Sequence, residues 1–387
     1  MKVCVVSRNI GNDYKGNFEF DQALALKEKG HEVYVLSLDF RSVRRKRKWG
    51  IYWSEYKGVH VLRCSFPMGP INDKIFQAVA RNRFKKAFEI LKKRSGRLDI
   101  VHTHFIGISY IAVYTMKEII KDTTPVVATE HSSTANVSLE QMEDITKRES
   151  YYVYNRVDEL ISVSNSLADN IFENFGIKSK VVYNVFDSEI FELPNREQKR
   201  EDFVFISAGN LTENKRMNLL IKGFDRAFGN DVNKNVKLYI FGEGPEKDNL
   251  KALICERRLD DRVILMGKKS RRELSGFYNK ADVFALLSEK ETFGVAYIEA
   301  MAMGMPVIAS YSGGPQSFVN EKVGMFTHDD ECEVAETLLE MKTNIEQYDS
   351  KYISDYAKHI CSPKTIAEEL TEIYEETLRG NYGENSK

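Results

Sequence analysis

The chain has 387 residues, of which 42% are hydrophobic and 29% charged, and this apolar content suffices for sizeable cores and excludes an intrinsically disordered chain. The 56 Lys and Arg residues nearly balance the 57 Asp and Glu residues, but residues 1–100 hold 22 basic against 10 acidic side chains, a net charge of +12. Five cysteines without a C-x-x-C pair argue against a disulfide framework or a cysteine-based zinc site, and they favour a reducing compartment.

Short strand-like runs alternate with helical patterns in the first half of the chain. Continuous apolar runs such as Val3–Val6 are typical of a parallel sheet with helices on both faces. Gly30 favours the end of the first helix at that position. The predicted strands are 2–6, 32–37, 59–63, 100–103, 126–129, 159–163 and 181–183. The predicted helices are 20–29, 73–94 and 107–121.

The same alternation restarts in the second half. The predicted strands are 203–207, 236–241, 263–266, 283–287 and 306–309. The predicted helices are 217–228, 246–257, 271–279 and 295–303. The sequence from Ser270 to Glu273 has capping-box spacing, which supports the third of these helices.

Two successive β/α blocks in a chain of this length predict an α/β fold with two Rossmann-like doubly wound domains. We expect the first domain at residues 1–188 and the second at 189–362. Ser362 and Pro363 are typical of a helix start, and they predict a last helix, 363–380, that packs back on the first domain.

The most informative stretch carries two glutamates eight residues apart, Glu291 and Glu299. In a doubly wound domain, the carboxyl ends of the strands and the helix N-termini beyond them form the ligand crevice. The amides of residues 293–295, at the start of the helix, would therefore face a bound anion. The two carboxylates flank this position at up to ~12 Å in a helix, and each can accept two sugar hydroxyls. Taken alone, they also fit a surface glutamate and an ordinary helical glutamate.

This glutamate pair, followed by Ala-Met-Ala-Met-Gly-Met-Pro-Val-Ile-Ala, resembles the signature of the family-4 retaining glycosyltransferases. That family has the GT-B fold, in which two Rossmann-like domains face each other across a cleft. Further segments match in the family's order, namely 205–215, 219–224, 238–245, 263–267, 278–282, Ser288 and 313–314. The first half matches more loosely, at 16–19, 30–33, 102–104, 129–131, 163–164 and 184–187.

The resemblance implies roles for individual residues. It implies that the catalytic residues are His131, which would contact the reacting sugar, Glu291, which would hold hydroxyls of the donor sugar, and Lys215, which would neutralise the leaving diphosphate. Glu299 would hold the ribose hydroxyls. The residues implied to bind the donor are Gly16, Asn17, Asn210, Lys215, Arg216, Gly242, Met266, Gly267, Lys268, Thr292, Phe293, Gly294, Val295 and Glu299. By itself, a lone histidine at a strand end such as His131 would be read as structural.

Several positions depart from the family pattern. Asn210 stands where the family usually has a phosphate-binding arginine, and Arg216 stands where it has glycine. Either Arg216 supplies the missing positive charge, or the site has one cation fewer with which to bind the diphosphate. Val185 replaces a usual glycine, and Ser317 replaces an acidic residue.

The sequence contains no Asp-x-Asp, the pattern with which other glycosyltransferase folds hold a metal–diphosphate complex. Lys215, a helix N-terminus and the candidate cation Arg216 would then stabilise the leaving group. We therefore expect no metal and no cofactor, since the nucleotide-sugar is a substrate.

Basic residues gather at 41–48 and 81–97 beside aromatic side chains. This combination is typical of docking on an anionic membrane leaflet, although a solvated loop and an ordinary amphipathic helix would show it too. No nucleic-acid-binding module accompanies the basic residues, so nucleic acid is not an expected partner. The apolar run at 2–6 is too short for a signal peptide, and 105–116 is too short for a membrane span. These features predict a cytoplasmic protein with at most a peripheral membrane contact.

The sequence thus predicts a retaining glycosyltransferase that moves a sugar from a nucleotide-diphosphate donor, with a UDP-sugar favoured, to a saccharide or lipid-linked saccharide in surface-glycan synthesis. The alternatives are a sugar-nucleotide epimerase on the same fold, a catalytically idle binding partner and an NAD-linked oxidoreductase. The oxidoreductase would need a G-x-G-x-x-G motif, whereas Lys247 occupies the third glycine position after Gly242 and Gly244.

Overall fold

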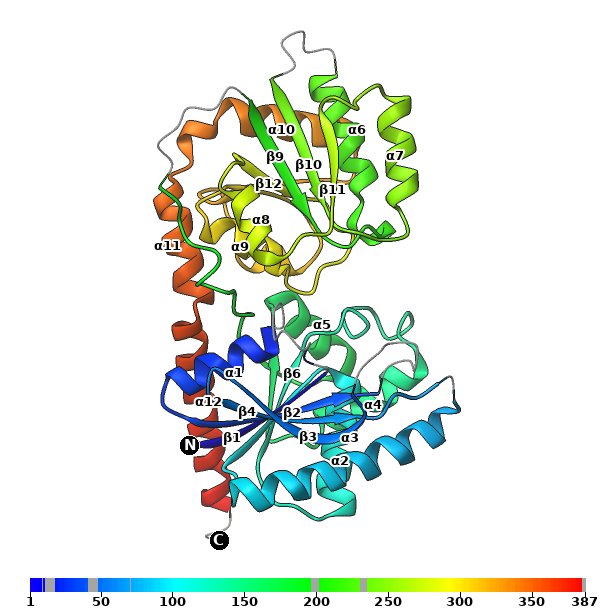
Figure 1. Ribbon diagram of the computed structural model, residues 1–387, viewed down its shortest axis with the longest axis vertical. Coiled ribbons are helices and arrows are strands. Elements are labelled where there is room, and N and C mark those ends of the chain that lie inside the picture. The colour runs from blue at the N-terminus through cyan, green and yellow to red at the C-terminus, as the bar shows by residue number, and fades with distance from the viewer. Residues whose placement is uncertain are drawn as a thin grey trace. The chain divides into compact units, whose positions relative to one another are not determined.

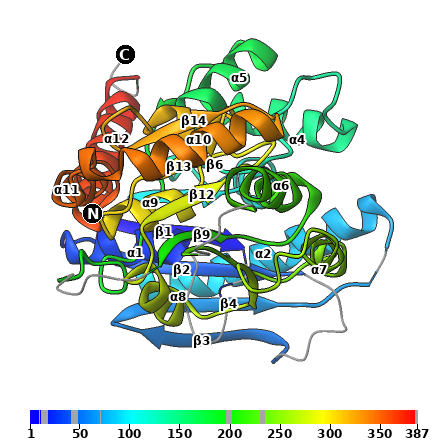
Figure 2. The same ribbon diagram turned by 90° about the horizontal axis from the view of Figure 1, so that it is seen from above.

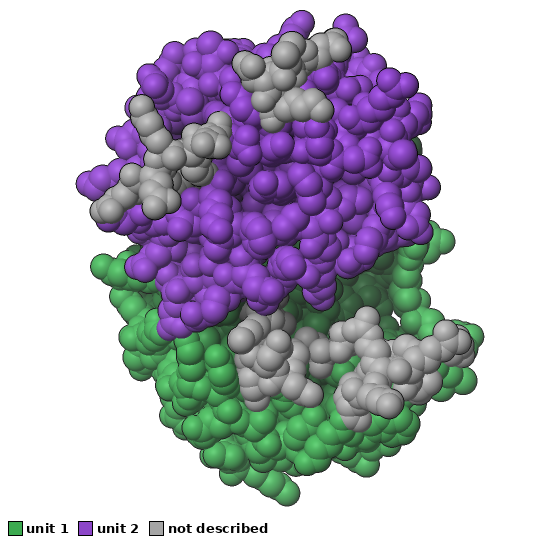
Figure 3. Space-filling model, turned by 45° about the horizontal axis from the view of Figure 1, so that its top comes forward, with its two compact units in different colours: residues 1–185, 363–387 green, residues 186–362 purple. Residues whose placement is uncertain are grey.

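The structure is a computed structural model that divides the chain into two compact units (Figure 3). It describes residues 1–8, 10, 18–40, 48–69, 71–195, 202–229 and 235–384. The first unit comprises residues 1–185 together with 363–387, and the second comprises residues 186–362. The boundary lies three residues before the expected position at 188, and the last helix belongs to the first unit.

The first unit contains an eight-stranded sheet in the order β3-β4-β2-β1-β5-β6-β7-β8. Figure 1 labels β1 to β4 and β6 of this sheet. Every neighbouring pair is parallel except β3 and β4, which are antiparallel. The strands are β1 (Lys2–Arg8), β2 (Glu32–Asp39), β3 (Gly50–Tyr56), β4 (Val59–Ser65), β5 (Ile100–His104), β6 (Val126–Glu130), β7 (Glu159–Ser162) and β8 (Lys180–Val181).

The edge strand β3 is absent from the predicted strands. It is half-exposed along nearly its whole length, so it lacks the continuous apolar run that marks the parallel strands. The turn that joins it to β4 has Lys57 and Gly58 at φ 47° and 72°. Left-handed residues at both central positions are typical of a two-residue hairpin, but the usual Asn-Gly or Asp-Gly signal is missing here.

Helices cover both faces of this sheet. They are α1 (Phe18–Glu28), α2 (Asp73–Ser95), α3 (Ile106–Tyr114), α4 (Asp144–Tyr154), α5 (Asn165–Phe175) and α12 (Pro363–Glu384). One core joins Phe20 and Leu26 of α1 with Ile366 and Leu370 of α12 against the strands, so the last helix helps to bury this face of the sheet. Helices α4 and α5 are absent from the predicted elements.

The predicted helix 107–121 changes its winding along its length. It is α-helical to Tyr114 and continues as a π-helical turn, η1 (Thr115–Ile119). The Thr115 hydroxyl donates a hydrogen bond to the Ile111 carbonyl at 2.7 Å. This side-chain bond occupies a carbonyl that helical amides use, which is consistent with the local widening.

The second unit contains a six-stranded, wholly parallel sheet in the order β11-β10-β9-β12-β13-β14. The strands are β9 (Phe203–Ala208), β10 (Val236–Phe241), β11 (Val263–Gly267), β12 (Val283–Leu286), β13 (Val307–Ser310) and β14 (Gly324–Thr327). The helices are α6 (Met217–Phe228), α7 (Lys247–Glu256), α8 (Arg271–Tyr278), α9 (Val295–Ala302), α10 (Glu331–Thr343) and α11 (Ser350–Cys361), with 3-10 turns η2 (Glu213–Lys215), η3 (Gly314–Ser317) and η4 (Ile345–Gln347). Helix α6 packs beside α10, and α9 packs against α11 (Figure 2). Strand β14 and helices α10 and α11 are absent from the predicted elements.

The strand order reverses beside β9, and this reversal matters for function. From β9 the chain proceeds outward to β10 and β11, and then returns to the opposite side of β9 with β12. The loops that follow β9 and β12 therefore diverge at the carboxyl edge of the sheet and leave a crevice there. The predicted fold class, α/β with two Rossmann-like doubly wound domains, is confirmed. Within the described ranges, the helices are all too short or too polar to cross a bilayer.

Glu149 of α4 is a buried carboxyl group in the first unit, with an exposed fraction of 6%. Its Oε1 accepts a hydrogen bond from Gln77 Nε2 of α2 at 2.8 Å. Burial raises the pKa of Glu149 to about 7, against the opposing effect of the neighbouring Arg148. Because its pKa is higher in the folded than in the unfolded chain, ionisation above pH ~4.5 favours unfolding.

We expect Glu149→Gln to stabilise the protein at pH 8 and to have little effect at pH 5. The ionisation penalty grows by about 2 kcal/mol over this interval, and glutamine keeps the acceptor for Gln77. Thermal unfolding at the two pH values should show a gain of about 5 °C at pH 8 alone. Glu89→Gln, at an exposed site of α2, is the matched control, and equal gains at both pH values would contradict the prediction.

Candidate functional site

Two loops at the reversal of the strand order carry a partly buried ion pair. Lys215 ends η2 after β9, and Glu291 follows β12. Nζ of Lys215 lies 2.5 Å from Oε2 of Glu291, and the two side chains are 19% and 16% exposed. The Ser288 hydroxyl donates to the same carboxylate oxygen at 3.2 Å. The structure thus brings together the two predicted catalytic residues of this unit, which are 76 positions apart in the sequence.

The loop after β12 is fixed by the loop after β13. The amide of Glu291 donates to the Ser312 carbonyl at 2.8 Å, and the Gly314 amide donates to the Glu291 carbonyl at 2.7 Å. The two loops approach so closely that a Cβ at position 314 would lie 2.5 Å from the Phe293 Cα. The backbone of Glu291 is therefore held on both sides, and this restricts the positions of its side chain.

Helix α9 begins directly after this loop. Gly294 precedes it with φ 94°, a left-handed conformation that favours glycine. Phe293 and Gly294 are buried, whereas Thr292 and Val295 are half-buried. The first amides of a helix have no partner within it and point outward along its axis, so they form a suitable seat for an anion. The predicted diphosphate position thus lies at a helix start that follows Glu291 directly.

Glu299, in the second turn of α9, is 7% exposed and does not stand alone. Nη2 of Arg271, the first residue of α8, lies 2.8 Å from its Oε1. Arg271 is absent from the predicted site residues. The capping box places it at a helix start, but no sequence signal links it to a carboxylate 28 residues later.

Of the remaining predicted donor residues, Asn210, Gly242 and Lys268 lie in the loops after β9, β10 and β11, and Met266 and Gly267 end β11 itself. The Gly242 amide donates to the Gly267 carbonyl at 3.1 Å, and a Cβ at position 242 would overlap the Gly209 carbonyl oxygen. The three loops are therefore neighbours along the carboxyl edge of the sheet. Asn210 and Lys268 in these loops are exposed, and Met266 in β11 is half-buried.

Arg216 is engaged with acidic side chains of its own. Its guanidinium pairs with Asp329 and, at 3.6 Å, with Glu289. The residue has φ 45°, in the left-handed region that favours glycine. Its positive charge is thus compensated by two carboxylates, while Lys215 is the cation that pairs with Glu291.

His131 follows β6 in the first unit and is 7% exposed. Its Nε2 lies 3.0 Å from Nδ1 of His104, and its ring packs against those of Phe18 and Phe105, with centroids 4.8 Å apart in each case. Burial, together with the nearby charge of Arg8, holds the pKa of His131 well below its ordinary value, so the ring is neutral near pH 7. The predicted residues Gly16 and Asn17 lie outside the described residues.

Glu130, next to His131, is a further buried residue to which the sequence assigned no role. Its carboxylate accepts hydrogen bonds from the amides of His131 and Ser132, at 2.9 and 2.7 Å, and from the Tyr154 hydroxyl at 3.2 Å. Burial raises the pKa of Glu130. These bonds fix the backbone at the end of β6, and with it the position of the His131 ring.

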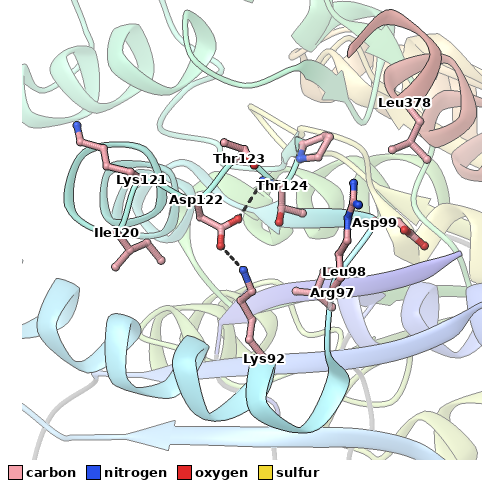
Figure 4. Close-up of a pocket in the computed structure, with 11 residues that line it drawn as sticks. Lys92, Arg97, Leu98, Asp99, Ile120, Lys121, Asp122, Thr123, Thr124 and Leu378 are labelled. Carbon is pink, nitrogen blue, oxygen red and sulfur yellow. Dashed lines mark hydrogen bonds and ion pairs between the residues drawn. The ribbon is translucent and has the colours of Figure 1, made fainter. Parts of the chain in front are cut away.

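A cavity of about 590 Å³ lies elsewhere in the first unit (Figure 4). Asp122 lies at its wall, where it accepts hydrogen bonds from Lys92 Nζ at 2.5 Å and from the Thr124 amide at 2.9 Å. Asp99 and Pro125 of the lining precede β5 and β6, so the cavity lies at the amino edge of the sheet, opposite the strand ends that carry His131. It is separate from the candidate site.

In the part of the chain that the structure describes, no group of three or more His, Cys, Asp and Glu side chains is arranged to hold a metal ion. Metal independence stays a prediction.

Comparison with known proteins gives matches over most of the chain. Residues 189–359 match the family model described as "Glycosyl transferases group 1", and residues 18–190 match the model described as "Glycosyltransferase Family 4".

Two curated relatives and one solved structure show the extent of the similarity. The N-acetyl-alpha-D-glucosaminyl L-malate synthase of Bacillus anthracis is 26% identical over 81% of this chain and 78% of its own. The alpha-monoglucosyldiacylglycerol synthase of Streptococcus pneumoniae is 23% identical over 92% of this chain and 81% of its own. The Anabaena protein HepE, solved with UDP and glucose, has a TM-score of 0.72 at 18% identity and covers 97% of this chain and all of its own.

Proposed function

Since the chain belongs to the group 1 glycosyltransferases of family 4, we propose that it transfers a sugar, with retention of configuration, from a UDP-sugar to a saccharide or lipid-linked saccharide acceptor. The observation that carries this proposal is the ion pair of Lys215 and Glu291 at the reversal of the strand order, beside the start of α9. A Campylobacter jejuni relative supports the lipid-linked acceptor: it is named N-acetylgalactosamine-N,N'-diacetylbacillosaminyl-diphospho-undecaprenol 4-alpha-N-acetylgalactosaminyltransferase and is 29% identical over 46% of this chain. The structure of HepE was solved with UDP, which supports uracil as the base of the donor nucleotide.

The geometry suits stabilisation of a leaving diphosphate. An ammonium group has three donors, so Lys215 can keep its contact with Glu291 and direct the remaining N–H groups at phosphate oxygens. The amides at the start of α9 add partial positive charge on the same side. Glu291 would accept hydrogen bonds from hydroxyls of the donor sugar, and Glu299 from those of the ribose. Electrostatics and positioning then supply most of the barrier reduction, and no protein nucleophile is needed.

Nucleotide release in the presence and absence of acceptor tests this function. A thermal-shift screen against UDP-, GDP- and ADP-sugars first identifies the donor, which should stabilise the fold selectively by mass action. Incubation with saccharide and lipid-linked acceptors should then release the nucleoside diphosphate only when an acceptor is present. Conversion of the donor to an isomer without acceptor would favour the epimerase, and binding without any turnover would favour the idle partner.

We also propose that the reaction is independent of a metal ion, because Lys215 and the α9 amides occupy the role that a divalent ion has at other diphosphate sites. The rate of transfer in excess EDTA should equal the rate in untreated enzyme. Loss of activity that is restored only by a divalent ion would contradict this expectation.

A third proposal concerns the membrane, and it would place the enzyme at the cytoplasmic leaflet. Trp49, Ile75 and Ile90 are exposed large apolar residues. The last two lie on α2 among the exposed basic residues Lys86 and Lys93. Apolar residues that penetrate the interface and lysines that attract anionic headgroups are typical of surface docking. The basic residues 41–47 lie outside the described residues.

Sedimentation with vesicles tests the proposal. The protein should pellet with phosphatidylglycerol vesicles at low salt and stay in the supernatant with phosphatidylcholine vesicles. The double variant Lys86→Glu and Lys93→Glu should lose this binding, whereas Lys251→Glu on α7 should retain it. Equal binding of both variants would contradict a contact through α2.

A further inference from the structure

The start of α8 carries an electrostatic conflict. Arg271 and Arg272 follow the N-cap residue Ser270, so two positive charges lie in the first turn of the helix. Cations are unfavourable there, because the helix dipole places partial positive charge at the same end. Arg272 is exposed and can be screened by water, but the side chain of Arg271 is only 17% exposed. A partly buried cation in this position requires compensation from other elements.

Two carboxylates supply this compensation. Glu299 of α9 lies 2.8 Å from Nη2 of Arg271, and Asp187, which follows the unit boundary, lies 4.0 Å from Nη1. The guanidinium also lies over the Phe191 ring at 6.0 Å from its centroid. Arg271 thus lies between a carboxylate on α9 and one in the segment that enters the second unit.

The charge of Glu299 requires Arg271 as a partner, just as the charge of Arg271 requires Glu299. A carboxylate that is 7% exposed has lost most of its hydration, and desolvation of a charge is tolerated only with a close partner. The 2.8 Å contact supplies that partner and also fixes the direction of the carboxylate, because a guanidinium is planar and its N–H groups point in set directions.

We propose that Arg271 is a positioning residue for the ribose site, which orients the Glu299 carboxylate and compensates its charge so that it can accept the ribose hydroxyls. This inference rests on the proposed function, in which Glu299 holds the ribose. Arg271 itself need not touch the nucleotide. Its effect should therefore appear specifically in the recognition of the ribose hydroxyls.

Binding of UDP and 2′-deoxy-UDP to the full-length protein, measured by calorimetry, separates this role from a general structural one. If the donor screen selects a guanosine nucleotide, GDP and 2′-deoxy-GDP replace UDP and 2′-deoxy-UDP in this experiment. Wild type should prefer the ribonucleotide by about tenfold, the usual effect of a hydrogen bond to a charged acceptor. Arg271→Gln should reduce this preference to near one and raise the donor KM about tenfold, with kcat changed less than threefold. Arg271→Lys should recover part of the preference, and Arg272→Gln should match wild type.

The outcomes distinguish this inference from the proposed function. If Glu299→Gln leaves the preference for ribose unchanged, the ribose role of Glu299 is wrong and the proposed function loses that element. If Glu299→Gln removes the preference while Arg271→Gln and Arg271→Lys keep it, only the positioning role is overturned. Equal weakening of both nucleotides in folded Arg271→Lys would also overturn it, because this would indicate a contact with phosphate or base. Circular dichroism of each variant verifies the fold, and Arg271→Lys carries the test if the glutamine variant does not fold.

Discussion

Replacement of Lys215 by alanine is expected to lower kcat by about two to three orders of magnitude, which is the usual cost of removing one preorganised group that stabilises developing negative charge. Among the residues that the structure describes, Lys215 is the cation that contacts Glu291. Arg216 beside it is already paired with Asp329 and Glu289. Asn210 offers no positive charge in its place. The site therefore has little redundancy, and the loss should fall mainly on the chemical step.

Steady-state rates of nucleotide release measure this effect. Lys247→Ala is the matched control, because this lysine also pairs with a carboxylate of the second unit, Glu243 at 3.0 Å, but does so on an exposed surface. The control should keep wild-type kcat within a factor of two. A Lys215→Ala variant that retains more than a tenth of wild-type kcat would show that another group stabilises the leaving diphosphate.

The sequence predicts the part of the fold that rests on periodicity. Buried parallel strands such as β1 and β12 are recognisable because helices cover both of their faces, so their central side chains are apolar on both sides. Strand β3 escapes prediction because it is a half-exposed edge strand, and β14 escapes because it begins with glycine and its two central residues are only half-buried. Burial matters more than length for the prediction of a strand, because the four-residue strands β7, β12 and β13 are predicted.

The contacts of the candidate site likewise include some that the sequence predicts and some that it does not. The proximity of Lys215 and Glu291 follows from topology, since both residues follow strands that flank the reversal of the order. The contact of Arg271 with Glu299 does not follow from topology, because it depends on the directions in which α8 and α9 point their side chains. Arg216 shows the same limit, since its position next to Lys215 suggests a shared role, whereas its partners come from two other loops.

The second large effect is expected for Gly314→Ala, which adds one methyl group behind the loop that carries Glu291. The new Cβ would lie 2.5 Å from the Phe293 Cα and 2.6 Å from its amide nitrogen and carbonyl oxygen. These are backbone atoms that cannot rotate away, so the 291–294 loop must move. We expect a loss of about 2 kcal/mol in the free energy of unfolding and, because a 1 Å displacement of catalytic groups costs about 100-fold, a comparable fall in kcat/KM.

Gly276→Ala provides the control for this prediction, because a Cβ at position 276 on α8 would meet no atom within 4 Å apart from the backbone of its own helix. Alanine within a helix should raise the free energy of unfolding by about 0.5–1 kcal/mol, with unchanged kcat/KM. Both variants add one methyl group, which contacts the catalytic loop in Gly314→Ala but not in Gly276→Ala. Thermal unfolding and steady-state kinetics of the two variants therefore measure the effect of that contact. If Gly314→Ala behaves like Gly276→Ala, the loop after β12 can adapt, and the close packing between residues 293 and 314 does not hold Glu291 in place.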